Sequence, residues 1–396
     1  MFAHKRGIST ENWRRVYTDA CILRSLADIL NMEHNELLHQ SMSDVCIARL
    51  DRAIIIAGPC GCGRLDLILE LIRGIQLHTS WTKKLNTSRS SLSSGDSLSK
   101  AIALPRTFAK PIPRLDLGVS PSLSAFASTY FMEPFILPGY VLDWPAMQEH
   151  PWRSIEYLEK IAGPGRIVPV EVGSDYRTDD WTQTLMSWES FLASLSVLYG
   201  GSEKEQVPKP VLYLAQHNLF TQFPALRNDI IVPDYVYAAP DAPENYPEYH
   251  PPANDEQLVT NVWLGPAGAV SPAHTDPFFN FYAQVVGKKT VWLSSPETSS
   301  YMYPYSNGNR NTDESPADPL SSHSNPAANN VEPLMSNTSR VDVFAPDDTK
   351  YPLFSRHVMP GAMCATLEPG DLLYFPPGWW HAMRSEETSF SVSMWF

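Results

Sequence analysis

Apolar residues near the start of the chain recur at steps of three and four residues, which is the spacing of one face of a helix. Between residues 11 and 78 this pattern predicts three helices. The second runs from the capping residue Ser43 to about Ala57, just before Gly58, and the third runs from Leu65 to about Leu77. We therefore predict a small all-α domain over residues 1–85.

The first of these helices has a single apolar stripe. Such a stripe is typical of an amphipathic helix that packs one side against a core. The stripe consists of Trp13, Val16, Ala20, Leu23, Ala27 and Leu30.

Two segments are too polar to build a core of their own. Residues 86–112 are rich in Ser and Pro and are typical of a flexible linker. Residues 306–338 are rich in Asn, Ser, Pro and Ala, and we expect them to be a disordered insertion between strands. If that insertion lies near an active site, it would narrow or extend substrate recognition.

Beyond residue 113 the period of the pattern becomes that of β-strands. Residues 280–293 contain two apolar-rich runs joined by Gly287-Lys288, and residues 370–375 predict a strand that turns at 376–378 and returns through 382–384. Residues 389–396 alternate apolar with mostly polar side chains. These patterns predict barrel strands in a mainly β domain over residues 113–396.

The net charge of −13 argues against a protein that follows nucleic-acid phosphates and fits a cationic protein partner. The acidic stretch 241–256 could attract a basic peptide, although a solvated loop is its ordinary explanation.

The five cysteines show no framework spacing, so reduced thiols in the nucleus or cytoplasm are expected. The first residues lack the apolar run of a signal peptide. Charged residues interrupt the most hydrophobic stretch, which predicts neither secretion nor membrane insertion.

The chemistry is concentrated in three residues. His274 and Asp276 are two positions apart, so in an extended strand they project to the same face, and His381 follows about 105 residues further along. Two imidazoles and one carboxylate form the facial triad that holds non-haem Fe(II) with open positions. An isolated His-x-Asp pair is more often a surface feature, so the interpretation depends on the surrounding strands.

Several separated blocks of the chain resemble the JmjC (jumonji C) oxygenases, which are built on a cupin-type barrel. More narrowly, they are similar to fungal-type relatives of jumonji-domain-containing protein five, a group also described as lysine demethylase eight. The resemblance covers essentially all of residues 113–396 and implies a double-stranded β-helix with surrounding helices. The blocks are residues 12–17, 168–174, 181–186, 213–220, 274–293 and 370–396.

The resemblance implies roles for particular residues. His274, Asp276 and His381 would be the iron ligands. Lys289 would form a salt bridge with the distal carboxylate of the co-substrate 2-oxoglutarate, and Tyr213 and Asn280 would hydrogen-bond the same group. A carboxylate taken out of water needs such a cation and donors. The alternative for Lys289 is a solvated turn residue like Lys288.

The substrate side of the iron would be formed, by the same resemblance, by Glu171, Trp263 and Ser271, with Gln216 nearby. A carboxylate and an aromatic face suit a planar guanidinium. Their ordinary alternatives are a glutamate at a strand edge, a core tryptophan and a turn serine.

The implied reaction couples oxidative decarboxylation of 2-oxoglutarate by O2 to hydroxylation of a C–H bond. Members of the group have been assigned both protein arginyl hydroxylation and histone-lysine demethylation. We favour arginine hydroxylation, because a methyl-lysine cage usually needs several aromatic residues. Histone methyl-lysine demethylation remains the alternative within the enzyme class, and a catalytically silent scaffold that binds a basic peptide is the alternative outside it. The sequence leaves open the substrate protein, the oligomeric state and the roles of the helical domain and the insertion.

Overall fold

The computed structural model describes residues 10–32, 39–78, 109–116, 118, 120–173, 175–177, 181–195, 210–305 and 336–396. The predicted linker, 86–112, lies outside these ranges except for its last four residues. The predicted insertion, 306–338, lies outside them except for its last three.

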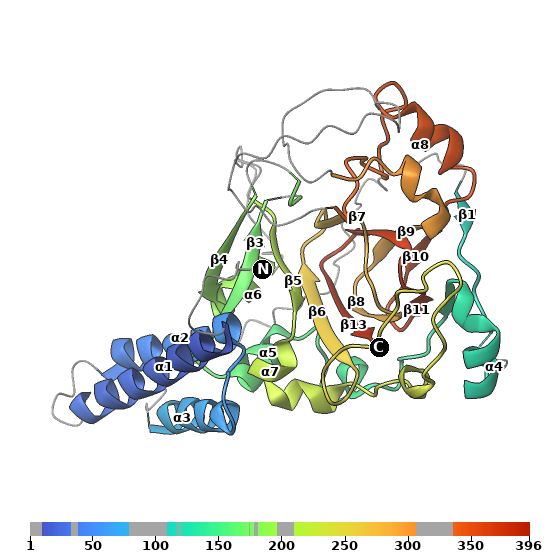
Figure 1. The fold of residues 1–396 in the computed structure, drawn as a ribbon. Helices are drawn as coiled ribbons and strands as arrows, with labels where there is room; N and C mark the ends of the chain where they lie inside the picture. Colours follow the sequence, from blue (N-terminus) through green and yellow to red (C-terminus); the bar gives the residue numbers. More distant parts are fainter. Residues whose placement is uncertain are drawn as a thin grey trace.

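Three helices lie at the start of the chain, as the apolar spacing predicts: α1 (Thr10–Met32), α2 (His39–Ala57) and α3 (Arg64–His78). They share a small core that includes Cys21, Leu50 and Ile72. The predicted end of α2 at Ala57 is correct, but its predicted start is wrong, because Ser43 lies inside the helix and is buried. Figure 1 shows the three helices together beside β3 and β4.

The predicted packing face of α1 is also wrong. Thr18, Cys21, Ile22 and Ser25 face the core, whereas all six stripe residues are exposed. Cys21 and Ile22 supply the apolar part of this face, and Leu26 and Ile29 pack against the same core. Trp13, Val16, Leu23 and Leu30 lie on the opposite side of the helix.

Two sheets form the barrel that follows these helices in the chain (Figure 1). One has five strands in the order β1 (Lys110–Pro111), β10 (Met363–Leu367), β9 (Lys289–Ser294), β12 (Trp380–Ser385) and β7 (Val270–Thr275). The other has eight, in the order β2 (Phe135–Leu137), β11 (Leu372–Phe375), β8 (Asn280–Val286), β13 (Ser389–Trp395), β6 (Val259–Gly265), β5 (Leu212–His217), β3 (Ile167–Val172) and β4 (Thr182–Ser187).

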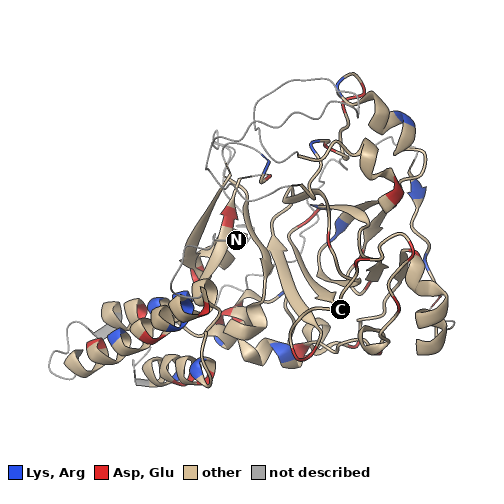
Figure 2. Ribbon diagram, in the orientation of Figure 1, with Lys and Arg blue, Asp and Glu red and all other residues tan. Residues whose placement is uncertain are grey.

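The two sheets face each other, because side chains from both meet in one buried cluster. Trp263 and Tyr282 enter it from the eight-stranded sheet, and Val291 and Met383 enter it from the five-stranded sheet. The predicted double-stranded β-helix with a helical region before it is therefore confirmed. Figure 2 shows that the barrel strands carry few charged residues, whereas charges of both signs are frequent on α1 to α3.

The predicted strand pairs on either side of 287–288 and 376–378 are present, but they are not hairpins. β8 and β9 belong to different sheets, as do β11 and β12. Gly287 makes the first crossing with a left-handed φ of 66°. A Cβ there would collide with the carbonyl of Thr388, so the crossing requires glycine.

Helices cover the outer faces of both sheets. Behind the eight-stranded sheet lie α4 (Leu123–Ser128), α5 (Ile155–Ala162), α6 (Trp188–Leu195) and α7 (Leu219–Gln222), and α8 (Pro352–His357) lies behind the other sheet. Short 3-10 helices complete the layers: η3 (Tyr130–Met132), η4 (Pro145–Met147), η5 (Pro224–Asp229), η6 (Asp234–Tyr237) and η7 (Pro296–Tyr301). Within the described part of the chain, no helix is both long and apolar enough to cross a membrane.

A buried ion pair joins the helices to the barrel. Asp51 of α2 accepts two hydrogen bonds from the guanidinium of Arg166, at 2.7 and 2.9 Å, and another from the backbone N–H of Ile167. Gln222 donates to the same carboxylate at 2.8 Å. The side chain of Arg166 is only 5% exposed and that of Asp51 is fully buried, so α2 is fixed to the start of β3.

Candidate metal centre and its pocket

Strand pairing brings the three predicted ligands together. His274 lies on β7 and His381 lies opposite it on the neighbouring strand β12. Asp276 follows directly after the end of β7, and its backbone carbonyl accepts a hydrogen bond from Gly378 at 2.8 Å. The long sequence gap between the two histidines is therefore closed by one pair of antiparallel strands.

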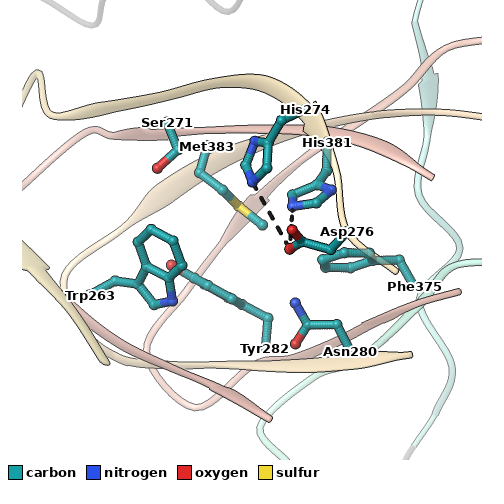
Figure 3. Close-up of a pocket in the computed structure, with 9 residues that line it drawn as sticks. All are labelled: Trp263, Ser271, His274, Asp276, Asn280, Tyr282, Phe375, His381 and Met383. Carbon is teal, nitrogen blue, oxygen red and sulfur yellow. Dashed lines mark ion pairs between the residues drawn. The ribbon is translucent and has the colours of Figure 1, made fainter. Parts of the chain in front are cut away.

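The ligand atoms form a compact cluster. Nε2 of His381 lies 3.4 Å and Nε2 of His274 lies 4.0 Å from the same oxygen of Asp276. One donor atom from each of the three residues lies within 4.8 Å of the other two. In Figure 3 both imidazoles point toward the carboxylate. This spacing suits three ligands of one metal ion.

Backbone carbonyls fix both imidazoles in the orientation that a metal needs. Nδ1 of His274 lies 2.7 Å from the carbonyl oxygen of Pro272, and Nδ1 of His381 lies 3.0 Å from that of Trp379. Because a carbonyl only accepts, each Nδ1 carries the proton and each Nε2 presents its lone pair to the cluster.

The charge states also suit metal binding. Burial, together with the neighbouring His381, lowers the pKa of His274 to about 4, so this imidazole is neutral at physiological pH. Burial works against ionisation of Asp276, but the two imidazoles outweigh it and hold its pKa below the usual value. The centre therefore offers a neutral imidazole and a carboxylate that is already ionised.

Lys289 lies inside the barrel and is fully buried, which supports the functional interpretation over that of a solvated turn residue. Its ammonium donates to the hydroxyl of Tyr282 at 2.8 Å and to that of Tyr213 at 3.1 Å. No carboxylate among the described residues contributes to its charge state, and burial alone lowers its pKa to about 7. Lys288, by contrast, is partly exposed and pairs with Glu368 at 3.1 Å.

Asn280 and Ser271 line the same pocket as the ligands. Oδ1 of Asn280 is buried and has no hydrogen-bond partner within the described structure. Ser271 hydrogen-bonds Tyr213, which is itself buried. A buried cation without an anion and a buried amide oxygen without a donor are the features of a site built for a polar ligand.

The four predicted substrate residues are placed differently. Trp263 and Ser271 line the pocket, and the indole N–H of Trp263 donates to Ser393 at 3.0 Å. Glu171 lies on β3 opposite Tyr213 of β5 and accepts a hydrogen bond from Trp181 at 3.3 Å. Gln216 lies outside the pocket, with an exposed side chain on a β-bulge and a positive φ of 47°.

Three further pocket residues are absent from the sequence-based prediction. Tyr282, Phe375 and Met383 line the pocket with the ligands, as Figure 3 shows. Tyr282 is two positions after Asn280, and Met383 is two positions after His381. Since alternate residues of a strand share a face, this spacing could have identified both.

The end of the predicted insertion runs beside the ligand strand. Thr275 donates its backbone N–H to the carbonyl of Asn337 at 3.0 Å, and the Asn337 side chain donates back to the carbonyl of Thr275 at 2.9 Å. Arg177 holds the following residues through a 2.8 Å hydrogen bond to the carbonyl of Val341. This segment, residues 336–341, therefore supports the exposed edge of β7.

Two facing sheets around two imidazoles and a carboxylate define a cupin-type barrel with a site for a divalent metal such as Fe(II). Residues 128–396 match the family model described as the cupin-like domain, and the chain belongs to the JmjC family of 2-oxoglutarate-dependent oxygenases.

Three relatives of this chain show the similarity. The chain is 33% identical to "Lysine-specific demethylase 8" of Danio rerio, over 98% of this chain and 81% of that protein. It is 36% identical to "Jumonji C domain-containing protein 5" of Drosophila melanogaster, over 72% of this chain and 59% of the fly protein. It is 27% identical to the human "Bifunctional peptidase and (3S)-lysyl hydroxylase JMJD7", over 66% of this chain and 77% of that protein. The predicted family membership is confirmed.

Proposed function

We propose that the chain is an Fe(II)- and 2-oxoglutarate-dependent dioxygenase that hydroxylates a protein side chain, with arginine as the preferred residue. The observation that carries the co-substrate part is the buried ammonium of Lys289, which has no carboxylate partner among the described residues. Leaving a cation unpaired in a protein interior is costly, and the distal carboxylate of 2-oxoglutarate would supply the missing charge.

In this proposal His274, Asp276 and His381 hold the iron. Bound Fe(II), 2-oxoglutarate and O2 supply oxidative decarboxylation coupled to hydroxylation of a C–H bond. Lys289 orients the co-substrate, with the hydroxyl of Tyr213 and the amide NH2 of Asn280 as further donors to its distal carboxylate. The protein excludes water with apolar walls and holds the reacting carbon near the metal.

The preference for arginine rests on a carboxylate that lacks a cation. Burial raises the pKa of Glu171, and among the described residues no lysine or arginine pairs with it. The indole of Trp181 fixes its carboxylate, and Trp263 adds an aromatic surface on the pocket. A guanidinium would satisfy both groups, through paired hydrogen bonds to the carboxylate and stacking on a ring.

The charge of the surface near the metal supports a basic protein substrate. Between Arg227 and Lys288 the sequence has no lysine or arginine. The ring of Tyr246, within the acidic stretch 241–256, packs against Gly378, the residue that donates to the backbone of Asp276. The five carboxylates of this stretch are exposed, so they would attract a cationic segment toward the metal.

Mass spectrometry of peptides incubated with the protein, Fe(II), 2-oxoglutarate and ascorbate tests the proposal. Arginine peptides should gain one oxygen atom, and Asp276→Ala should abolish the gain. Glu171→Gln keeps the shape of the side chain but removes its charge, so it should raise KM for the arginine peptide about tenfold or more while leaving 2-oxoglutarate binding unchanged.

Demethylation of histone methyl-lysine is the second candidate, and the name of the Danio rerio relative favours it. Both reactions begin with hydroxylation of a C–H bond. Loss of a methyl group from methyl-lysine peptides, with no oxygen gained on arginine, would move the assignment to demethylation. Binding of 2-oxoglutarate and peptide without release of succinate would instead indicate a silent scaffold.

A further inference from the structure

Helix α1 presents several large apolar side chains to solvent. Trp13, Val16, Leu23 and Leu30 are 62%, 58%, 65% and 63% exposed. With Ala20 and Ala27 they form the exposed stripe, which lies on the side of α1 opposite the residues that pack on α2. Scattered single apolar residues on a surface are ordinary, but a continuous row from Trp13 to Leu30 along one helix is not.

The spacing of the stripe is that of a coiled coil. Its six members follow one another at alternating steps of three and four residues, which gives the a and d positions of successive heptads. A helix that packs only once against a globular core usually carries a broader apolar face. Here the exposed face carries the narrow seam, and the core contacts are made by a separate face.

We propose that the exposed stripe of α1 binds the same stripe of a second copy of this chain, as a parallel two-stranded coiled coil. Trp13, Ala20 and Ala27 would occupy the a positions, and Val16, Leu23 and Leu30 would occupy the d positions. Each residue would then face its own equivalent across a two-fold axis, which is the usual symmetry of a homodimer.

The charges beside the stripe favour a second copy in parallel orientation. Asp19 lies at the g position before Ala20, and Arg24 lies at the e position after Leu23. In a parallel coil a g residue faces the e residue five positions later on the partner helix, so each Asp19 would meet an Arg24. In an antiparallel coil g residues face g residues and e residues face e residues, and this attraction would be absent.

Both side chains have room for the new contact. The side chains of Arg24 and Asp19 are 70% and 45% exposed. Arg24 also pairs with Asp28 on its own helix, and Asp19 pairs with Arg64 of α3. A contact between copies would extend these pairs into a network along both edges of the seam.

Small alanines at two of the three a positions limit the apolar contact, so the dimer should form and dissociate with concentration. Sedimentation velocity on the full chain should show a monomer of 44.4 kDa at low concentration and twice that mass when concentration rises about a hundredfold. Because α2 is fixed to the barrel, association would hold two barrels in one particle.

Leu23→Glu places a charge in the middle of the seam and should give a monomer throughout. Leu77→Glu is the matched control, since Leu77 is 73% exposed but lies on α3; it should associate like the unchanged protein. Ala27→Ile introduces the β-branched residue that two-stranded coils prefer at a positions. It should shift the transition from monomer to dimer to at least tenfold lower protein concentration.

A cysteine variant tests whether the two α1 helices run parallel. Leu23→Cys should form a disulfide between two copies upon mild oxidation, because d residues face each other only in the parallel arrangement. A monomer at every concentration, including for Ala27→Ile, would overturn the proposal and leave the stripe to a different occupant. A dimer that survives Leu23→Glu would also overturn it, because the interface would then lie elsewhere. Circular dichroism checks that each variant keeps its helices.

Discussion

Replacing Lys289 with methionine should stabilise the ligand-free protein while abolishing its response to 2-oxoglutarate. Methionine fills a similar volume without a charge. The lysine is fully buried, and its contacts are the hydroxyls of Tyr213 and Tyr282 rather than a carboxylate. Keeping this amine in the interior without a ligand therefore lowers the stability of the fold.

The size of the expected stability gain follows from the pKa of Lys289. A pKa lowered from 10.5 to about 7 corresponds to roughly 5 kcal/mol of lost stability at neutral pH and below. Methionine would recover this, less about 1 kcal/mol for each of the two hydroxyls that lose the Nζ donor. The expected net gain is about 3 kcal/mol at pH 7.

The pH dependence has a definite sign. Between pH 7 and 10.5 the unfolded chain keeps the proton on Lys289 and the folded chain has lost it. The unfolded state then binds more protons, so the stability of the unchanged protein rises with pH in this window. The advantage of Lys289→Met should therefore shrink as pH rises from 7 toward 10.5.

Urea unfolding at several pH values measures this directly. Lys288→Met is the matched control, because Lys288 forms a surface ion pair with Glu368, and its loss should cost less than about 1 kcal/mol. With Mn(II) present throughout, adding 2-oxoglutarate should raise the Tm of the unchanged protein and of the control further, but should give Lys289→Met no increase beyond that of Mn(II) alone. A methionine variant that is less stable at pH 7, or whose difference does not change with pH, would refute the reasoning.

Other substitutions test the metal centre and its supports. Asp276→Ala should remove the increase in Tm that Mn(II) gives the unchanged protein, since two imidazoles alone hold the ion poorly; an unchanged increase would place the metal elsewhere. Asp51→Ala leaves the guanidinium of Arg166 buried without its carboxylate and should cost roughly 3–5 kcal/mol in urea unfolding, whereas a loss below about 1 kcal/mol would mean that water reaches this junction. Arg177→Ala should release residues 336–341 and weaken Mn(II) binding about tenfold, as measured by electron paramagnetic resonance; unchanged affinity would show that β7 holds the ligands without this support.

Most of the metal centre can be predicted from the sequence, because the geometry of a strand is local. Residues two apart on a strand share a face, so the spacing of His274 and Asp276 is enough to pair them. The same rule places Tyr282 beside Asn280 and Met383 beside His381 in the pocket, although the sequence-based prediction did not extend to them. The position of Gln216 could not be obtained in this way, because the bulge in β5 breaks the alternation there.

The sequence by itself determined the ligand types, the strands that carry them and the helices before them, since these follow from side-chain chemistry and from periods of two or 3.6 residues. Tertiary structure alone decided which sheet each strand joins, because pairing between distant segments leaves no mark in a local pattern. It also decided that Lys289 has no acidic partner among the described residues and that Asp51 meets Arg166. For α1, the tertiary structure buries the face opposite to the one that the apolar stripe predicts. The pattern shows that a helix is amphipathic, but it cannot show what covers the apolar side.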